Sequence, residues 1–174
     1  MFVAQPERPE FDVLYRDHFE AVWRFVGRRL PAADVDDVAN EVFVVAWRRR
    51  REIESEFTRA WLYGVARRLI ANRLRQRRRQ ANLVLRIMGF GSPESITPYE
   101  VEGAIDPTSR LGMVWDTLTA NEREILMLQA WEGVSSVEIA VTLGISEAAA
   151  RQRLSRALRS ARESWRSLGP NSEG

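Results

Sequence analysis

The sequence predicts an all-α protein made of two small helical domains joined by a flexible linker, with a helix-turn-helix in the second domain. Apolar residues recur at three- and four-residue steps in several segments, which is the spacing of amphipathic helices. A stretch rich in proline and glycine divides these segments into two groups. We therefore assign residues 1–88 to the first domain, 89–107 to the linker and 108–174 to the second domain.

Three helices are expected in the first domain. An apolar stripe that begins at Phe11 and ends before Pro31 predicts the first helix. Asp34 precedes the second as its N-cap, and that helix shows acids in its first turns and arginines in its last, as the helix dipole favours. The third begins near Thr58 and combines an apolar face with a basic face that includes Trp61.

The linker GFGSPESITPYEVEGAIDP holds three prolines, three glycines and four acids, a composition typical of a tether. Four shorter helical patterns follow it. Thr119 with Glu122 and Ser135 with Glu138 have the spacing of capping boxes, Ser146 caps the last helix, and two glycines mark helix ends, Gly133 and Gly144.

Charge is segregated along the chain although the net charge is only +2. Every basic residue is arginine; nine lie within residues 57–93, where there is no acid, and six lie within 151–166 against a single glutamate. Residues 94–150 hold ten acids and two arginines. Two separated basic patches predict a polyanion contacted at two places.

Residues 133–159 have the spacing of a helix-turn-helix, in which Ala140 allows a close helix crossing and Gly144 can adopt the left-handed turn conformation. The exposed side of the last helix is expected to enter the major groove, where arginine can contact guanine and glutamine adenine. Which arginines contact bases and which contact phosphates stays open at this point. The predicted DNA-binding residues are Glu147, Arg151, Gln152, Arg153, Ser155, Arg156 and Arg159.

These motifs together resemble a known family. LTANEREILMLQAWEGVSSVEIAVTLGISEAAARQRLSRAL is similar to region four of bacterial sigma factors, DVDDVANEVFVVAW to their region-two core-binding helix, and FTRAWLYGVARRLIANRLRQRRR to the segment that reads and melts the −10 box. The order and the spacing resemble the extracytoplasmic-function (ECF) type. The resemblance implies a non-catalytic factor that binds core RNA polymerase and directs promoter recognition and transcription initiation, with the last helix on the −35 box.

In such factors the region-two helix docks on the clamp helices of the polymerase β′ subunit, and the resemblance also implies the β flap, promoter DNA and an anti-sigma factor as partners. The exposed polar residues of that helix would carry the docking, whereas Phe43 and Trp47 are better explained as core. The residues expected to bind core polymerase are Asp36, Asp37, Asn40 and Glu41.

The resemblance further places a pocket for unstacked −10 bases at the loop of residues 52–58, supported by the basic face of the third helix. For Trp61, base stacking and half-buried packing remain equal alternatives. Arg68 and Asn72 stand where the family often has asparagine and aspartate, which bears on promoter preference. The predicted −10 residues are Trp61, Arg67, Arg68, Asn72 and Arg75.

Two other functions compete with this one. A stand-alone helix-turn-helix regulator explains residues 135–159 but leaves the acidic-faced helix and the second basic patch without a role. An enzyme would have to rely on His18, a lone histidine on an apolar stripe, because the sequence has no cysteine, no glycine-rich phosphate loop and no metal-ligand cluster. We expect no cofactor, no metal and no membrane insertion, and a cytoplasmic location.

Overall fold

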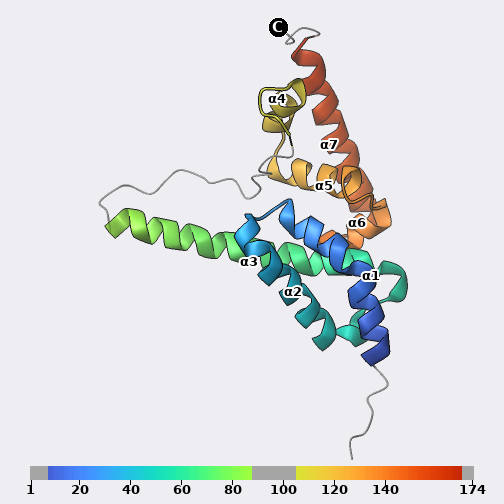
Figure 1. Ribbon diagram of the computed structural model, residues 1–174. Helices are drawn as coiled ribbons and strands as arrows, with labels where there is room; N and C mark the ends of the chain where they lie inside the picture. Colours follow the sequence, from blue (N-terminus) through green and yellow to red (C-terminus); the bar gives the residue numbers. More distant parts are fainter. Residues whose placement is uncertain (1–7, 88–104, 170–174) are drawn as a thin grey trace, which may run out of the picture.

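The computed structural model describes residues 8–87 and 105–169 (Figure 1). Its regular structure over these ranges is entirely helical, which confirms the predicted fold class. We refer to residues 8–87 as the N-terminal part and to residues 105–169 as the C-terminal part. The elements are α1 (Arg8–Gly27), α2 (Ala32–Arg48), the 3₁₀ turns η1 (Arg50–Glu52) and η2 (Ser55–Phe57), α3 (Thr58–Ile87), α4 (Arg110–Thr117), α5 (Ala120–Ala130), α6 (Ser136–Leu143) and α7 (Glu147–Ser167).

The N-terminal part is a three-helix unit in which α1, α2 and α3 pack against one another. The apolar stripes that predicted these helices form its core, and Val22, Val42 and Leu62 are completely buried. Phe25 of α1 stacks on Tyr63 of α3, with ring centroids 4.4 Å apart. Burial of such side chains, each worth about 1.5–3 kcal/mol, orients the polar faces of all three helices outward.

The prediction that Asp34 caps α2 is wrong. The helix begins two residues earlier, at Ala32, and Pro31 is the N-cap residue. Proline is well suited to a helix start because the first N–H groups of a helix have no intrahelical partner, so the missing donor costs little there. The carboxylate of Asp34 is buried and lies 2.6 Å from Nε of Arg77 on α3. Asp34 therefore pairs with an arginine of another helix, a partner that local spacing cannot reveal.

In the C-terminal part all three predicted hydroxyl caps are present. Thr119 and Ser135 form complete capping boxes with Glu122 and Glu138, respectively, and Ser146 accepts a hydrogen bond from the backbone N–H of Ala149. Gly144 is the C-cap of α6 with a φ of +66°, where an L side chain would be strained, whereas α5 ends at Ala130 with Trp131 as its C-cap, so Gly133, with a φ of +62°, lies in the turn that follows and does not cap the helix. These caps fix short helices that would be marginal alone.

Residues 105–107, which the sequence assigns to the linker, form an ordered turn before α4. The Asp106 carboxylate accepts hydrogen bonds from the backbone N–H and the hydroxyl of Thr108. The chain then passes so close to α4 that a Cβ at Gly112 would lie 2.2 Å from the carbonyl oxygen of Asp106. The rest of the predicted linker, apart from this turn, lies outside the described residues.

The two parts contact each other, with α6 packed across α3 (Figure 1). At the crossing the Thr142 hydroxyl donates a hydrogen bond to the carbonyl of Ala60 across 3.1 Å. Gly64 allows the close approach, because a Cβ there would lie 3.1 Å from the carbonyl oxygen of Thr142. The polar faces of α2, α3 and α7 therefore belong to one assembled body.

Candidate nucleic-acid and protein interfaces

The polar face of α7 is largely exposed. Ala150 and Ala157 are completely buried against the rest of the C-terminal part, which turns the opposite side of the helix to solvent. Glu147 is half-buried and lies 3.3 Å from Arg151 as an i,i+4 ion pair. The other predicted residues of this face are all exposed: Arg151, Gln152, Arg153, Ser155, Arg156 and Arg159.

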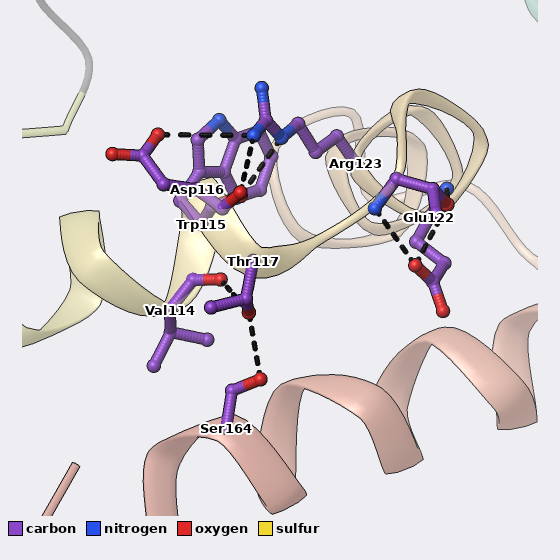
Figure 2. A network of polar contacts seen from close by, with 8 residues as sticks. Val114, Trp115, Asp116, Thr117, Glu122, Arg123 and Ser164 are labelled. Carbon is purple, nitrogen blue, oxygen red and sulfur yellow. Dashed lines mark hydrogen bonds and ion pairs between the residues drawn. The ribbon is translucent and has the colours of Figure 1, made fainter. Parts of the chain in front are cut away.

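The orientation of α7 is set by polar contacts with α4 and α5 (Figure 2). The hydroxyls of Thr117 and Ser164 lie 2.7 Å apart, and Thr117 also donates to the carbonyl of Val114. Arg123 of α5 holds the end of α4 by donating from Nε to the carbonyl of Trp115, 2.8 Å away. The polar face of α7 is thus held by a framework of three helices and does not depend on α7 alone.

Glu122 links α5 directly to α7. While one of its oxygens completes the capping box with Thr119, the other accepts a hydrogen bond of 2.6 Å from the Ser160 hydroxyl. Burial raises the pKa of this carboxyl, but the hydrogen bonds from Ser160 and Thr119 outweigh that effect, so the pKa lies below its ordinary value. The carboxylate therefore stays ionised and keeps both roles at neutral pH.

The basic face of α3 lines a hollow of about 360 Å³. Arg67, Arg68, Asn72 and Arg75 border it together with Ala71, so four of the five predicted −10 residues lie together. Arg68, Asn72 and Arg75 are exposed. Arg75 donates to the amide oxygen of Asn72, which fixes the two side chains relative to each other. A row of guanidinium groups around a hollow suits the phosphates of a single strand.

Trp61, the fifth predicted −10 residue, does not border this hollow. It is half-buried and packs partly against the core, which agrees with the packing alternative, while base stacking stays a prediction. Arg67 does not face solvent freely, since its guanidinium binds both carboxylate oxygens of Glu124 on α5, with Nη2 2.9 Å from Oε2. Glu124 was missed by the sequence analysis because the two residues are 57 positions apart.

The acidic face of α2 is exposed as predicted. Asp36, Asp37, Asn40 and Glu41 all face solvent, whereas Phe43 is buried. The same face includes Val44, whose side chain is 47% exposed, an apolar residue that the sequence analysis did not select. It could have been found by helical spacing, because it lies three and four positions after Glu41 and Asn40.

Trp23 of α1 extends this face beyond α2. Its indole Nε1 donates a hydrogen bond of 2.7 Å to the Asp36 carboxylate, although the ring is 42% exposed. Trp23 and Asp36 also border a hollow of about 360 Å³ that Arg24 and Arg28 help to line. Tryptophan is enriched at protein interfaces, whose rims are polar.

His18 does not support a catalytic site. It is half-buried, and burial lowers its pKa; the nearby Asp17 raises the pKa in part, and Arg59 lowers it further. Over residues 8–87 and 105–169 the acidic and histidine side chains form no cluster that could hold a metal ion. Within the same ranges no helix combines the length and the apolar character that crossing a bilayer requires.

Comparison with known proteins agrees with this arrangement. Residues 14–80 match the family described as Sigma-70 region 2, and residues 110–160 match Sigma-70, region 4. The chain is 35% identical over 172 residues to the ECF RNA polymerase sigma factor SigL of Mycobacterium tuberculosis, with 95% of this chain and 94% of SigL covered. It is 29% identical over 136 residues to the RNA polymerase sigma factor CnrH of Cupriavidus metallidurans, which covers 74% of this chain and 71% of CnrH.

Two solved structures have the same fold. The sigma factor RpoE of Bartonella quintana, in complex with the anti-sigma factor NepR, gives a TM-score of 0.56 at 20% identity over 90% of this chain and 97% of that one. CnrH in complex with the cytosolic domain of CnrY gives 0.57 at 23% identity over 91% and 88%. The chain belongs to the ECF RNA polymerase sigma factors, a non-enzymatic family that directs RNA polymerase to promoters and starts transcription.

Proposed function

We propose that three surfaces of this sigma factor divide the work of initiation. The acidic face of α2 docks on the β′ clamp helices of core polymerase, the hollow on α3 binds the opened −10 strand, and the exposed face of α7 reads the −35 duplex. The observation that carries this proposal is that buried alanines turn all the arginines of the first turns of α7 outward, as a major-groove helix requires.

Docking through α2 is supported by its combination of acids and an exposed apolar residue. Asp37, Asn40, Glu41 and Val44 lie on one face, and Trp23 holds Asp36 at its edge. Carboxylates at a protein interface contribute mainly to the association rate and to the choice of partner, while apolar contact contributes affinity. We assign Val44 and Trp23 to the docking surface alongside the four predicted polar residues.

Two further partners are proposed. The β flap is proposed to hold this part at the distance from α3 that separates the −35 and −10 boxes. The structures of RpoE and CnrH were solved in complex with NepR and with the cytosolic domain of CnrY, respectively. We therefore also propose an anti-sigma factor as a partner of this chain. We propose that it acts in the cytoplasm, where the polymerase is.

Charge reversal tests the docking face. Asp37→Arg with Glu41→Arg is expected to reduce core-polymerase affinity at least tenfold while the circular dichroism spectrum and the melting temperature stay unchanged. Asp12→Arg, which reverses an exposed acid on α1, is the control and is expected to bind normally. Equal affinities of the double variant and the control would remove α2 from the docking surface.

Run-off transcription separates this function from a stand-alone regulator. Core polymerase with the purified chain is expected to start transcripts on genomic fragments, whereas the chain alone is expected to bind duplex DNA weakly. Tight, site-specific duplex binding by the isolated chain without any effect on polymerase would favour the regulator.

A further inference from the structure

The C-terminal half of α3 carries more arginines than the proposed function uses. Ile70 is completely buried, whereas every side chain from residue 71 to residue 80 is half-buried or exposed. The helix nevertheless continues to Ile87, and Figure 1 shows this half of α3 extending away from the other helices. We refer to residues 71–87 as the arm, which is about 25 Å long at the rise of an α-helix.

The arginines of the arm include two pairs on opposite faces. Arg73 and Arg77 lie four positions apart and face α2, where the carboxylate of Asp34 is 3.9 Å from the first and 2.6 Å from the second. Arg75 and Arg79 also lie four positions apart, but they are offset by two residues, which is about 200° around a helix. Both are exposed. One pair therefore holds α2, while the other pair faces solvent.

The solvent-facing pair continues the line of the hollow on α3. Four exposed residues follow one another at steps of four, three and four positions and form one stripe along the helix: Arg68, Asn72, Arg75 and Arg79. The first three border the hollow that is proposed to bind the −10 strand, and Arg79 lies one turn beyond it. A polyanion that leaves the hollow along the helix would therefore meet Arg79 next.

No charge among the described residues accounts for Arg79. The helix α3 contains nine arginines and no acid, and no described carboxylate of another helix pairs with Arg79. The helix dipole favours cations in the last turn, whereas Arg79 lies eight residues before the end of α3. Like charges at i,i+4, such as Arg75 and Arg79, destabilise a helix. Binding of a polyanion would remove this cost.

The composition of the arm favours paired over single-stranded DNA. Proteins bind single strands by stacking bases on aromatic side chains beside cationic groups. Residues 71–87 contain no tryptophan, tyrosine or phenylalanine. A duplex keeps its bases stacked and presents one phosphate per about 3.4 Å of each strand, while Arg75 and Arg79 are separated by about 6 Å along the helix axis. Arginines without aromatic neighbours suit such a backbone.

We propose that the arm binds the phosphate backbone of the paired DNA directly upstream of the −10 box, and that Arg79 makes this contact whatever the base sequence. The proposal rests on the proposed role of the hollow at the −10 strand. Beyond the hollow the opened strand is paired again, and the stripe leads from one region to the other. The arm also precedes, in the chain, the part that is proposed to read the −35 box, which assigns it to the upstream side.

The salt dependence of promoter binding tests this contact. Core polymerase with the full-length chain is bound to a duplex promoter fragment selected by run-off transcription, and its affinity is measured over a range of salt concentrations. Loss of one phosphate contact lowers the slope of log affinity against log salt concentration by about 1. We expect this fall for Arg79→Gln with every spacer sequence. Arg77→Gln removes the same charge from the opposite face of the arm and is expected to keep the original slope.

Neutral linkages locate the contact on the DNA. Methylphosphonates in place of the phosphates directly upstream of the −10 box are expected to lower the slope of the unaltered chain, and Arg79→Gln is expected to make no further difference on this DNA. A single-stranded oligonucleotide that carries the −10 box alone removes the paired DNA. Polymerase with the unaltered chain and polymerase with Arg79→Gln are expected to bind it equally well.

Three results would overturn the proposal. Equal slopes for Arg79→Gln and the unaltered chain on duplex DNA would exclude the contact, and an equal loss on the single-stranded oligonucleotide would assign Arg79 to the −10 strand. A loss of core-polymerase affinity without DNA would show that the arm binds the polymerase. Arg79→Lys keeps the charge and is expected to keep the slope, and circular dichroism checks that each variant is folded. Failure of the proposed function would instead appear as an absence of run-off transcription by the unaltered chain.

Discussion

Asp34 in the first turn of α2 and Arg77 in the middle of α3 form an ion pair of 2.6 Å, and Arg73 lies 3.9 Å from the same carboxylate. The side chain of Asp34 is 12% exposed, whereas that of Arg77 is 43% exposed. This pair joins the helix proposed to dock on polymerase to the helix proposed to hold the strand. The pair adds to the packing of α2 against α3, which sets the relative placement of the two surfaces.

Asp34→Asn is expected to destabilise the protein by about 1 kcal/mol, because water screens the exposed end of Arg77 and keeps the pair weak. Urea denaturation of Asp34→Asn, Arg77→Gln and the double variant would give the coupling energy between the two residues. Asp37→Asn, an exposed acid three residues along the same helix, is the control for a loss of charge near the helix start. A coupling energy of zero would mean that the pair does not join the helices.

Tyr63 predicts an alkaline limit to stability. Burial, followed by the nearby Glu132 carboxylate, raises the pKa of its phenol from 10.0 to about 12, and the side chain is 2% exposed. Above pH 10 the unfolded chain ionises this phenol while the folded chain does not, so the stability is complete below pH 10 and falls as the pH rises toward 12. Two pKa units correspond to a loss of about 3 kcal/mol.

The contribution of Tyr63 to this loss of stability can be separated from that of other groups. The chain has no lysine, arginine does not titrate in this pH window, and only three tyrosines are present. Denaturant titrations between pH 9 and pH 12 are expected to show the fall in the parent protein and a much flatter profile in Tyr63→Phe. Tyr15→Phe, at a 38% exposed position, is expected to retain the fall. Parallel profiles for all three proteins would show that Tyr63 does not cause the effect.

Trp23→Phe tests the edge of the docking surface. The substitution keeps an aromatic ring but removes the donor of the hydrogen bond to Asp36, which frees the carboxylate to rotate. Loss of this exposed intramolecular hydrogen bond is expected to lower the unfolding free energy by about 1 kcal/mol or less, and to lower core-polymerase affinity by about fivefold or less because the Asp36 carboxylate is no longer held in place. Trp165→Phe, at another exposed indole on the distant α7, serves as the control. Equal affinity for the two variants would exclude Trp23 from the interface.

Arg151→Ala is expected to weaken −35 recognition by the polymerase complex, with Arg162→Ala, further along the same exposed helix, as the matched control. The size and the sequence selectivity of the effect distinguish a base contact from a phosphate contact. A base contact costs about 1–3 kcal/mol and relaxes preference at one position, whereas a phosphate contact weakens all sequences alike and lowers the salt slope by about 1. Identical footprints for both variants would remove Arg151 from the recognition face.

The sequence predicted what depends on neighbours along the chain. The capping boxes at Thr119 and Ser135, the left-handed Gly144 and the outward face of α7 all follow from spacings of three or four residues, and all are present. The exposed face of α2 and the grouping of four −10 residues on α3 follow from the same periodicity.

What the sequence did not predict depends on residues far apart in the chain. Asp34 has the composition of a cap, yet its partner is 43 positions away on α3, and the partner of Arg67 is 57 positions away. Helical spacing identifies which side of a helix is polar but not which charge of another helix will face it. Trp23 and Val44 were missed for another reason. Trp23 falls within the apolar stripe of the first helix, and only polar residues were selected on the second helix, although both side chains are exposed.

The two hydrogen-bonding roles of Glu122 have a consequence for how this family member can vary. One carboxylate both starts α5 and sets the rotation of α7 through Ser160. A shorter replacement would lose the hydrogen bond to Ser160 and is therefore expected to shift the exposed arginines of α7 while leaving the helices intact. If those arginines read the promoter as proposed, selectivity would then be altered by a residue that does not itself contact DNA.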